Sequence, residues 1–171
     1  MESAATTANK HLATYLNDHL AGSVTLLELL SHLAFAYADT PVARFATELH
    51  GDIAADRATL ESLMEMLHIP QSAMRNASAW VAEKFAQLKL RLDDHSGGAL
   101  RLLEATEVIS LGIEGKRLLW LALAAASQGA TQLCDPGYER LIRRAVDQRS
   151  RVEAVRQEAA VLAMSLERSS V

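Results

Sequence analysis

The chain has 171 residues, half of them hydrophobic, so a single domain of ordinary size can bury a substantial core. Its 17 basic residues are interleaved with 21 acidic ones, which argues against a nucleic-acid-binding surface. A lone cysteine, Cys134, excludes an internal disulfide, and residues 1–10 hold no apolar segment typical of a signal peptide, so we expect a cytoplasmic protein with no membrane span.

The first predicted element is a long helix over residues 7–37. Aromatic residues are only 5% of the chain, glycine and proline are sparse, and the abundant Ala, Leu, Glu and Arg all favour helix. Residues on one face of this segment recur at spacings of three and four: Leu12, Leu16, His19, Ser23, Leu26, Leu30, Leu33 and Tyr37. One continuous helix face is therefore predicted.

Two further helices are predicted before the middle of the chain. Thr40 followed by Pro41 is typical of an N-cap with proline at the first helical position, so the second helix is expected over residues 41–67, ending before Pro70. A shorter amphipathic helix is expected over residues 72–92, and the segment 94–98 then interrupts the helical pattern.

The last two predicted helices cover residues 99–127 and 136–167. The first of them is apolar on two faces, one marked by Leu111 and Leu118 and the other by Ile113 and Trp120, so we expect it to be the most buried helix. Asp135 and Pro136 predict a second cap-and-proline start for the final helix. No segment has the pattern of a strand, and no linker divides the chain, which predicts one all-α domain over residues 1–171.

Polar residues interrupt the apolar faces of the four long helices near their midpoints. They are His19 and Ser23, Asp52 and Asp56, Glu107 and Glu114, and Gln148 with Arg149, Glu153 and Arg156 beside it. Because a buried unpaired charge is costly, a layer formed by these groups requires either a metal ion or opposite charges. Arg149 and Arg156 are the cations expected to neutralise the carboxylates, and His19 and Gln148 are expected to complete the hydrogen bonds.

The order of elements resembles the ferritin-like superfamily, and in particular its small uncharacterised bacterial members. Two helical pairs with short internal connections are joined by one long connection, which in that superfamily is the crossover of an antiparallel four-helix bundle. The local support is the run from Tyr15 through His19 to Ser23 and the run from Asp52 through Asp56 to Arg57. The resemblance implies a four-helix bundle with an additional amphipathic helix in the crossover.

Metal-binding members of that superfamily use a Glu on each of two helices and a Glu-x-x-His pair on each of the other two. This chain departs from that pattern, because His19 stands where a Glu is expected and neither Asp52 nor Asp56 has a His three residues on. A degenerate iron or manganese site is therefore the metal hypothesis. Its candidate ligands are His19, Asp52, Asp56, Glu107 and Glu114.

Three functions remain open from the sequence. The leading hypothesis is a structural or partner-binding homodimer in which an ion-pair network replaces the two metal ions, with no resident cofactor. The alternatives are a di-iron or di-manganese oxidoreductase with an unusual ligand set, and a bundle that binds a small apolar ligand. No nucleophile or phosphate-binding loop is recognisable, so no catalytic residue is predicted. Arg140, Arg143 and Arg144 form a basic cluster flanked by acids, which we expect to be a solvated face.

Overall fold

The computed structural model describes residues 2–71, 98–130, 133 and 136–165, and in these ranges all regular structure is α-helical. The helices are α1 (Glu2–Ala36), α2 (Pro41–Met66), α4 (Gly98–Ser127) and α5 (Tyr138–Met164). All four long helices predicted from the sequence are confirmed, with ends that differ by a few residues. The amphipathic helix expected over 72–92 lies outside the described residues.

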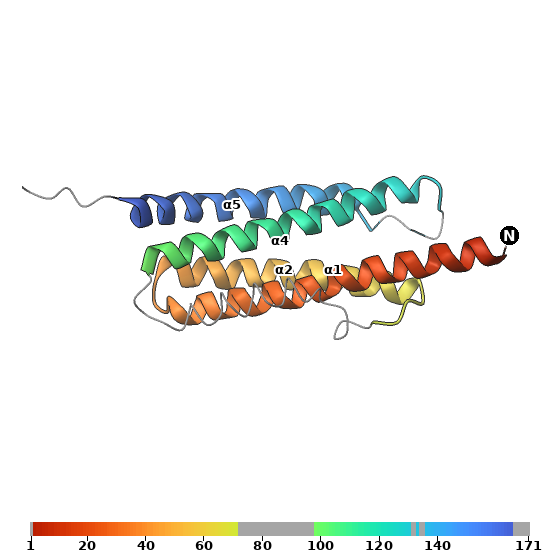
Figure 1. The fold of residues 1–171 in the computed structure, drawn as a ribbon, viewed down its shortest axis with the longest axis horizontal. Helices are drawn as coiled ribbons and strands as arrows, with labels where there is room; N and C mark the ends of the chain where they lie inside the picture. The colour runs from red at the N-terminus through yellow and green to blue at the C-terminus, as the bar shows by residue number, and fades with distance from the viewer. Residues whose placement is uncertain (1, 72–97, 131–132, 134–135, 166–171) are drawn as a thin grey trace, which may run out of the picture.

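The four helices form a bundle of two antiparallel pairs (Figure 1). α1 packs along α2, and α4 packs along α5, while α1 contacts α4 and α2 contacts α5 between the pairs. The Tyr37 hydroxyl, just after α1, donates a hydrogen bond of 2.8 Å to the carbonyl of Gly98 at the start of α4. α2 and α4 therefore begin at the same end of the bundle and run parallel to each other.

Because α2 and α4 run parallel, the connection between the two helical pairs has to link opposite ends of the bundle. α2 ends at the opposite end of the bundle from the start of α4 (Figure 1). A helix of 26 residues is about 39 Å long at 1.5 Å per residue, so the chain between Met66 and Gly98 has to span a comparable distance. The two short connections, by contrast, each join adjacent ends of neighbouring antiparallel helices.

Local chemistry explains where α2 begins and ends. The Thr40 hydroxyl accepts a hydrogen bond of 3.3 Å from the backbone amide of Ala43, and Pro41 occupies the first turn, so the predicted cap is confirmed. At the other end His68 adopts a positive φ of 54°, and the amide of Ile69 donates to the carbonyl of Met64. This left-handed turn satisfies a terminal carbonyl and ends the helix.

The start of α5 differs from the prediction. The helix begins at Tyr138, and the residue before it, Gly137, has a φ of 90° and makes no side-chain capping bond. Pro136 is outside the helix, and Asp135 lies outside the described residues. A φ of this sign is available to glycine without steric penalty, so the backbone turns into the helix at Gly137 and not at the expected Asp-Pro pair.

The buried apolar residues form two clusters, one toward each end of the bundle. The first contains Leu26, Leu30, Ile53, Ile113 and Val152 among others. The second is built around Trp120 and Tyr138 and also contains Leu16, Leu20, Leu60, Leu119 and Leu141. On α2 and α4 the chain passes from one cluster to the other near the middle of the helix, between Ile53 and Leu60 and between Ile113 and Leu119.

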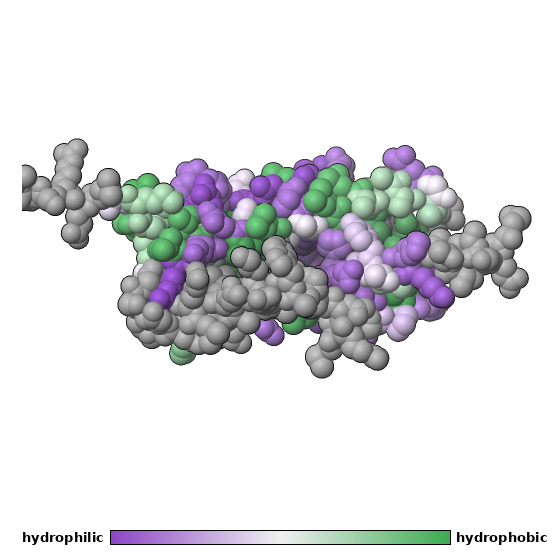
Figure 2. All heavy atoms as spheres, in the orientation of Figure 1, coloured by the Kyte–Doolittle hydropathy of each residue, from purple (hydrophilic) through white to green (hydrophobic). Residues whose placement is uncertain are grey.

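The burial of α4 differs in part from the prediction that it is the most buried helix. Its face with Ile113 and Trp120 is buried in the core as predicted, but the face with Leu111 and Leu118 lies in solvent. Leu111 is 72% exposed and Leu118 is 49% exposed. The sequence marks both faces as apolar, but the neighbours that pack on α4 are α1 and α5, and they leave the face with Leu111 and Leu118 uncovered. Figure 2 shows apolar patches among hydrophilic ones over α4 and α5.

One stretch of α1 is long and apolar enough to cross a membrane by length and composition alone, from Lys10 to Ala36. Buried core helices of soluble bundles meet the same criterion. Here Leu16, Leu30 and Leu33 are completely buried by the chain itself, although only 33% of the apolar window of this stretch is buried inside the bundle. Their burial accounts for the apolar character of this face of α1.

The cap at Thr40 generates a stability prediction. Replacing Thr40 by Ala removes the acceptor for the Ala43 amide and should lower the free energy of unfolding by about 1 kcal/mol. Thr47 is the matched control, because it is exposed and its hydroxyl only donates back to the carbonyl of Ala43. Chemical denaturation followed by circular dichroism measures both variants. An equal effect of Thr40→Ala and Thr47→Ala would show that the cap contributes nothing.

Candidate functional site

Asp56 is the most buried charged residue in the described part of the chain. It lies on α2 between Ile53 of one apolar cluster and Leu60 of the other, and it is only 2% exposed. Its carboxylate accepts hydrogen bonds from Lys116 of α4 and from Arg144 of α5. Both contacts are also ion pairs. The carboxylate therefore joins three helices at the boundary between the two clusters.

Gln148 of α5 completes this group. Its side chain is fully buried, its amide nitrogen donates to Asp56 Oδ2 at 3.0 Å, and its amide oxygen accepts from the Lys116 ammonium. Asp56 Oδ2 thus has two donors and Asp56 Oδ1 has a third, from Arg144. We call Asp56, Lys116, Arg144 and Gln148 the interior network.

The interior network carries two cations and one anion. Burial lowers the pKa of Lys116 below its ordinary value, because desolvation disfavours the charged ammonium, and nearby Arg144 adds to this effect. Asp56, and more weakly Asp52, act in the opposite direction. Arg144 is partly exposed, at 36%, so its charge is shared with solvent. The buried acid is fully compensated by groups of the chain itself.

The neighbouring carboxylates are paired nearer the surface. Asp52, one turn before Asp56, forms an ion pair with Arg151 of α5, and both side chains are about two-fifths exposed. Glu114 binds Arg149 of α5 at 2.6 Å and also Arg117 of its own helix. The hydrogen bond from Arg117 lowers the pKa of Glu114 below its ordinary value. These pairs lie along the seams of α5 with α2 and α4.

Glu107 occupies the same seam between α4 and α5 but is the most exposed of the candidate ligands. It lies 3.8 Å from Arg156, and its side chain is 54% exposed. Arg156 makes shorter contacts with Glu153 on its own helix, and their hydrogen bonds lower the pKa of Glu153 to about 2. Arg149 and Arg156 therefore neutralise Glu114 and Glu107, two of the carboxylates for which they were expected, but Asp56 has different partners.

His19 is half-buried on α1 and contacts the ring of Tyr15. The two ring centroids are 4.7 Å apart, and the rings meet edge to face. Burial lowers the pKa of His19 below its ordinary value, although Asp18 opposes the shift, so the imidazole is neutral at neutral pH. Ser23, one turn on, donates to the carbonyl of Leu20. Neither side chain forms a described hydrogen bond with the interior network.

The five predicted metal ligands are not gathered at one point. In residues 2–71, 98–130, 133 and 136–165, no three His, Cys, Asp or Glu side chains lie where they could hold one metal ion. Asp52, Asp56, Glu107 and Glu114 each lie against an arginine or lysine instead. The arrangement brings together opposite charges, and the chemistry it supports is the electrostatic joining of helices.

Two members of the interior network were missed from the sequence. The sequence pattern did not single out Lys116, and it placed Arg144 in a solvated basic cluster with Arg140 and Arg143. Arg143 does face solvent, paired with Glu139, but Arg144 points to Asp56. The signal was present in the spacing, because Lys116 follows Ile113 by three residues and precedes Trp120 by four, and Arg144 precedes Gln148 by four.

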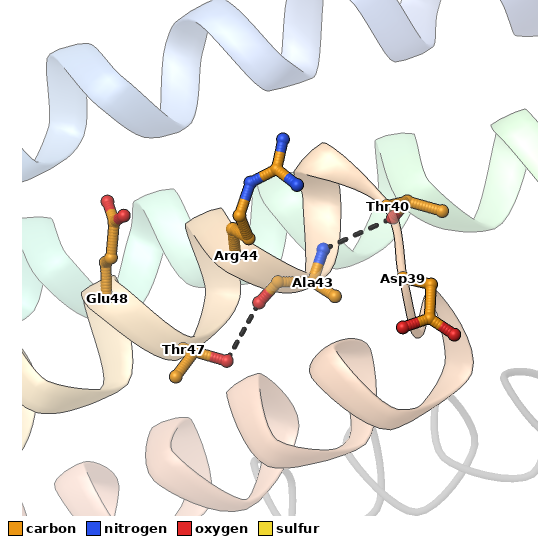
Figure 3. Close-up of a pocket in the computed structure, with 6 residues that line it drawn as sticks. All are labelled: Asp39, Thr40, Ala43, Arg44, Thr47 and Glu48. Atoms are coloured by element: carbon orange, nitrogen blue, oxygen red, sulfur yellow. Dashed lines mark hydrogen bonds between the residues drawn. The ribbon is translucent and has the colours of Figure 1, made fainter.

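A separate hollow lies at the turn between α1 and α2 (Figure 3). Its lining residues are Asp39, Thr40, Ala43, Arg44, Thr47 and Glu48. None of these side chains is buried, and Arg44 and Glu48 project from the same side of α2 (Figure 3). Two of the polar groups serve the helix itself, through the Thr40 cap and the Thr47 hydroxyl. Five of its six lining residues are polar or charged, whereas small-molecule sites are lined predominantly by hydrophobic and aromatic side chains.

The interior network predicts a large difference between two neighbouring carboxylates. Asp56→Ala leaves Lys116 and Arg144 facing each other without an anion, so it should lower the free energy of unfolding by about 3–5 kcal/mol. Asp52→Ala breaks only a partly exposed pair and should cost at most about 1 kcal/mol. Denaturant unfolding measures both. Equal losses of unfolding free energy in the two variants would show that Asp56 stabilises the bundle no more than Asp52 does.

The lowered pKa of Lys116 predicts a dependence of stability on alkaline pH. Between its lowered folded-state pKa and its ordinary value of 10.5, the unfolded chain holds a proton that the folded chain has released. This proton difference makes the free energy of unfolding rise with pH across that interval. Lys116→Met removes the titrating group and should flatten the rise. Denaturation at a series of pH values compares the slopes, and an unchanged slope in the variant would contradict the assignment.

Comparisons with known proteins do not identify a function for this site. No family model matches the chain, and comparisons with curated proteins and with solved structures likewise find no match. The function therefore has to be argued from the bundle topology and from the chemistry of its interior.

Proposed function

We propose that the protein is a ferritin-like bundle in which an internal ion-pair network takes the place of the two metal ions, and that it acts as a structural or partner-binding domain. The observation that carries the proposal is the compensation of Asp56 by Lys116 and Arg144 in the interior. The protein is then a rigid helical scaffold whose surface, and not its interior, performs its function.

The topology supports the ferritin-like part of the proposal. α2 and α4 start at the same end and run parallel, so one connection has to cross the length of the bundle (Figure 1). An up-down-up-down bundle has three short connections and makes all consecutive helices antiparallel. Bundles with a single long crossover include the ferritin-like folds. The arrangement of α1, α2, α4 and α5 is of the second kind.

The donor set supports the absence of a di-metal centre. Iron and manganese sites of such bundles use carboxylates and histidines that converge from four helices. Here α4 contributes a lysine and α5 contributes an arginine and a glutamine to the interior position that Asp56 occupies. A metal ion placed beside Asp56 would meet two fixed positive charges a few ångströms away. These residues do not fit such a centre.

The surface supports a role in partner binding. Apolar side chains that remain exposed in the folded bundle gather on α4 and near the end of α5, including Leu111, Leu118 and Leu162. A soluble bundle gains nothing from leaving such residues in water, whereas an interface would use them. The charged side chains between α5 and its neighbours α2 and α4 already form ion pairs within the chain. Binding through apolar contacts is thus the activity that the described residues favour.

Metal content tests this proposal directly. The protein is purified, incubated anaerobically with Fe(II) or with Mn(II), desalted and analysed by mass spectrometry for bound metal, with Asp56→Asn and Glu107→Gln as matched variants. We expect substoichiometric metal that is the same in all three proteins. Two equivalents of iron or manganese per chain, lost in both variants, would replace the proposal by a di-metal oxidoreductase with an unusual ligand set.

A further inference from the structure

We propose that the side chains of Lys116 and Gln148 become joined by an amide bond, with Asp56 moving the protons, so that α4 and α5 are cross-linked inside the bundle. The amine of Lys116 displaces the side-chain nitrogen of Gln148, which leaves as ammonia. A reaction of this kind goes beyond the proposed scaffold function. It depends only on the geometry of the interior network and not on what the surface binds.

The two groups that react are already in contact. The Lys116 ammonium donates a hydrogen bond to the amide oxygen of Gln148, so the carbonyl carbon, one bond from that oxygen, lies beside the amine. Gln148 is fully buried, and the Lys116 side chain is only 13% exposed. Two reactants held together in this way behave as if each were present at a concentration on the order of 10⁵ M or more, when their orbitals are aligned. The fold therefore supplies the approach of the amine to the amide.

The Asp56 carboxylate lies between the attacking nitrogen and the leaving nitrogen. Its Oδ2 atom accepts a hydrogen bond from Lys116 and a second one, of 3.0 Å, from Gln148 Nε2. Arg144 binds the other oxygen, Oδ1, and so leaves Oδ2 to these two nitrogens. A carboxylate in contact with both nitrogens serves first as general base and then as general acid. Asp56 is thus the catalytic residue of the reaction.

The reaction balances within these three side chains. Asp56 takes a proton from the Lys116 ammonium, and the freed lone pair of the amine forms a bond to Gln148 Cδ. Asp56 then gives that proton to Nε2, and the bond between Cδ and Nε2 breaks with its electron pair leaving on ammonia. The new amide nitrogen releases its extra proton to Asp56, which passes it to the ammonia and becomes a carboxylate again. The products are one side-chain amide and one ammonium ion.

The surroundings of Lys116 favour the attacking form of the amine. Desolvation lowers the pKa of Lys116, nearby Arg144 adds to the effect, and Asp56 opposes it. The neutral amine, which is the nucleophile, is therefore more accessible than in a solvated lysine. Ile113 and Trp120, on the same face of α4, are at most 1% exposed. Such buried apolar neighbours keep water from competing for the carbonyl carbon.

Gln148 is the better acceptor of the two groups that Lys116 touches. Asp56 is the anion of two ion pairs, and its negative charge opposes attack by an electron pair. The amide of Gln148 is neutral. A bond to Asp56 would release water, whereas a bond to Gln148 releases ammonia, so the mass of the product distinguishes the two.

The amide gives the bundle a covalent tie that its lone cysteine cannot provide. The bond joins residues 32 positions apart and closes a loop through both helices and their connection. Closing a loop restricts the unfolded chain, as a disulfide does. The rise of stability at alkaline pH belongs to the chain whose Lys116 is still a free amine, and formation of the amide abolishes it.

Intact-protein mass spectrometry tests the bond. The wild-type chain should be lighter than the mass of its sequence by one molecule of ammonia, either as purified or after incubation for several days. Trypsin cuts after arginine and free lysine but not after a lysine in an amide, so the digest should contain residues 102–117 joined to residues 145–149. Lys116→Arg and Gln148→Met should each retain the full mass. Asp56→Asn should form the bond at least tenfold more slowly.

Gln157→Met is the matched control. Gln157 lies on the same helix, but its amide nitrogen donates to Glu153, so this variant should keep the ammonia deficit. Circular dichroism checks that each variant is folded, and Lys116→Arg, which keeps the cation, remains informative if Asp56→Asn does not fold. The inference is overturned by a wild-type chain that keeps its full mass throughout, by a deficit of one water, or by an ammonia deficit that persists in Gln148→Met. An unchanged rate in folded Asp56→Asn contradicts the role of Asp56.

Discussion

The burial of the Asp56 carboxylate is the constraint on which the arrangement of this bundle depends. An uncompensated charge at 2% exposure would cost several kcal/mol, so α4 and α5 have to present cations at one fixed height on the axis of α2. Lys116 and Arg144 do this, and Gln148 occupies the remaining hydrogen-bonding positions. Because α2, α4 and α5 all contribute to these contacts, the network ties the three helices together at this level.

The same network explains the electrostatic character of the interior. Two cations and one anion share a poorly solvated space, so any additional cation there is opposed, and the lysine itself is driven toward its neutral form. A metal centre of the ferritin-like type depends on the opposite balance, with an excess of carboxylates that is neutralised by the metal. With Lys116 and Gln148 as its partners, the Asp56 carboxylate joins helices instead of adding to an excess of negative charge.

The sequence was sufficient to predict the four long helices, because each has an apolar face repeating at three and four residues and Thr40 with Pro41 is a strong local cap. It was insufficient for features decided by neighbouring helices. The periodicity of α4 marks two apolar faces equally, and only the positions of α1 and α5 determine that Leu111 is left in solvent. Likewise Arg144 belongs by spacing to both a surface cluster and an interior row, and the burial of Asp56 decides between them.

The separation of charge from apolar surface on α4 follows from these constraints. Its cations and its Glu114 are committed to Asp56, Arg149 and the α5 seam, so the side that faces away from the bundle is left with leucine, alanine and glycine. An amphipathic helix would normally place its charges on that side. In α4 apolar residues lie on two sides: Ile113 and Trp120 fill the core, while Leu111 and Leu118 face outward. Under the proposed partner-binding role, this exposed apolar side of α4 is the surface that a partner would cover.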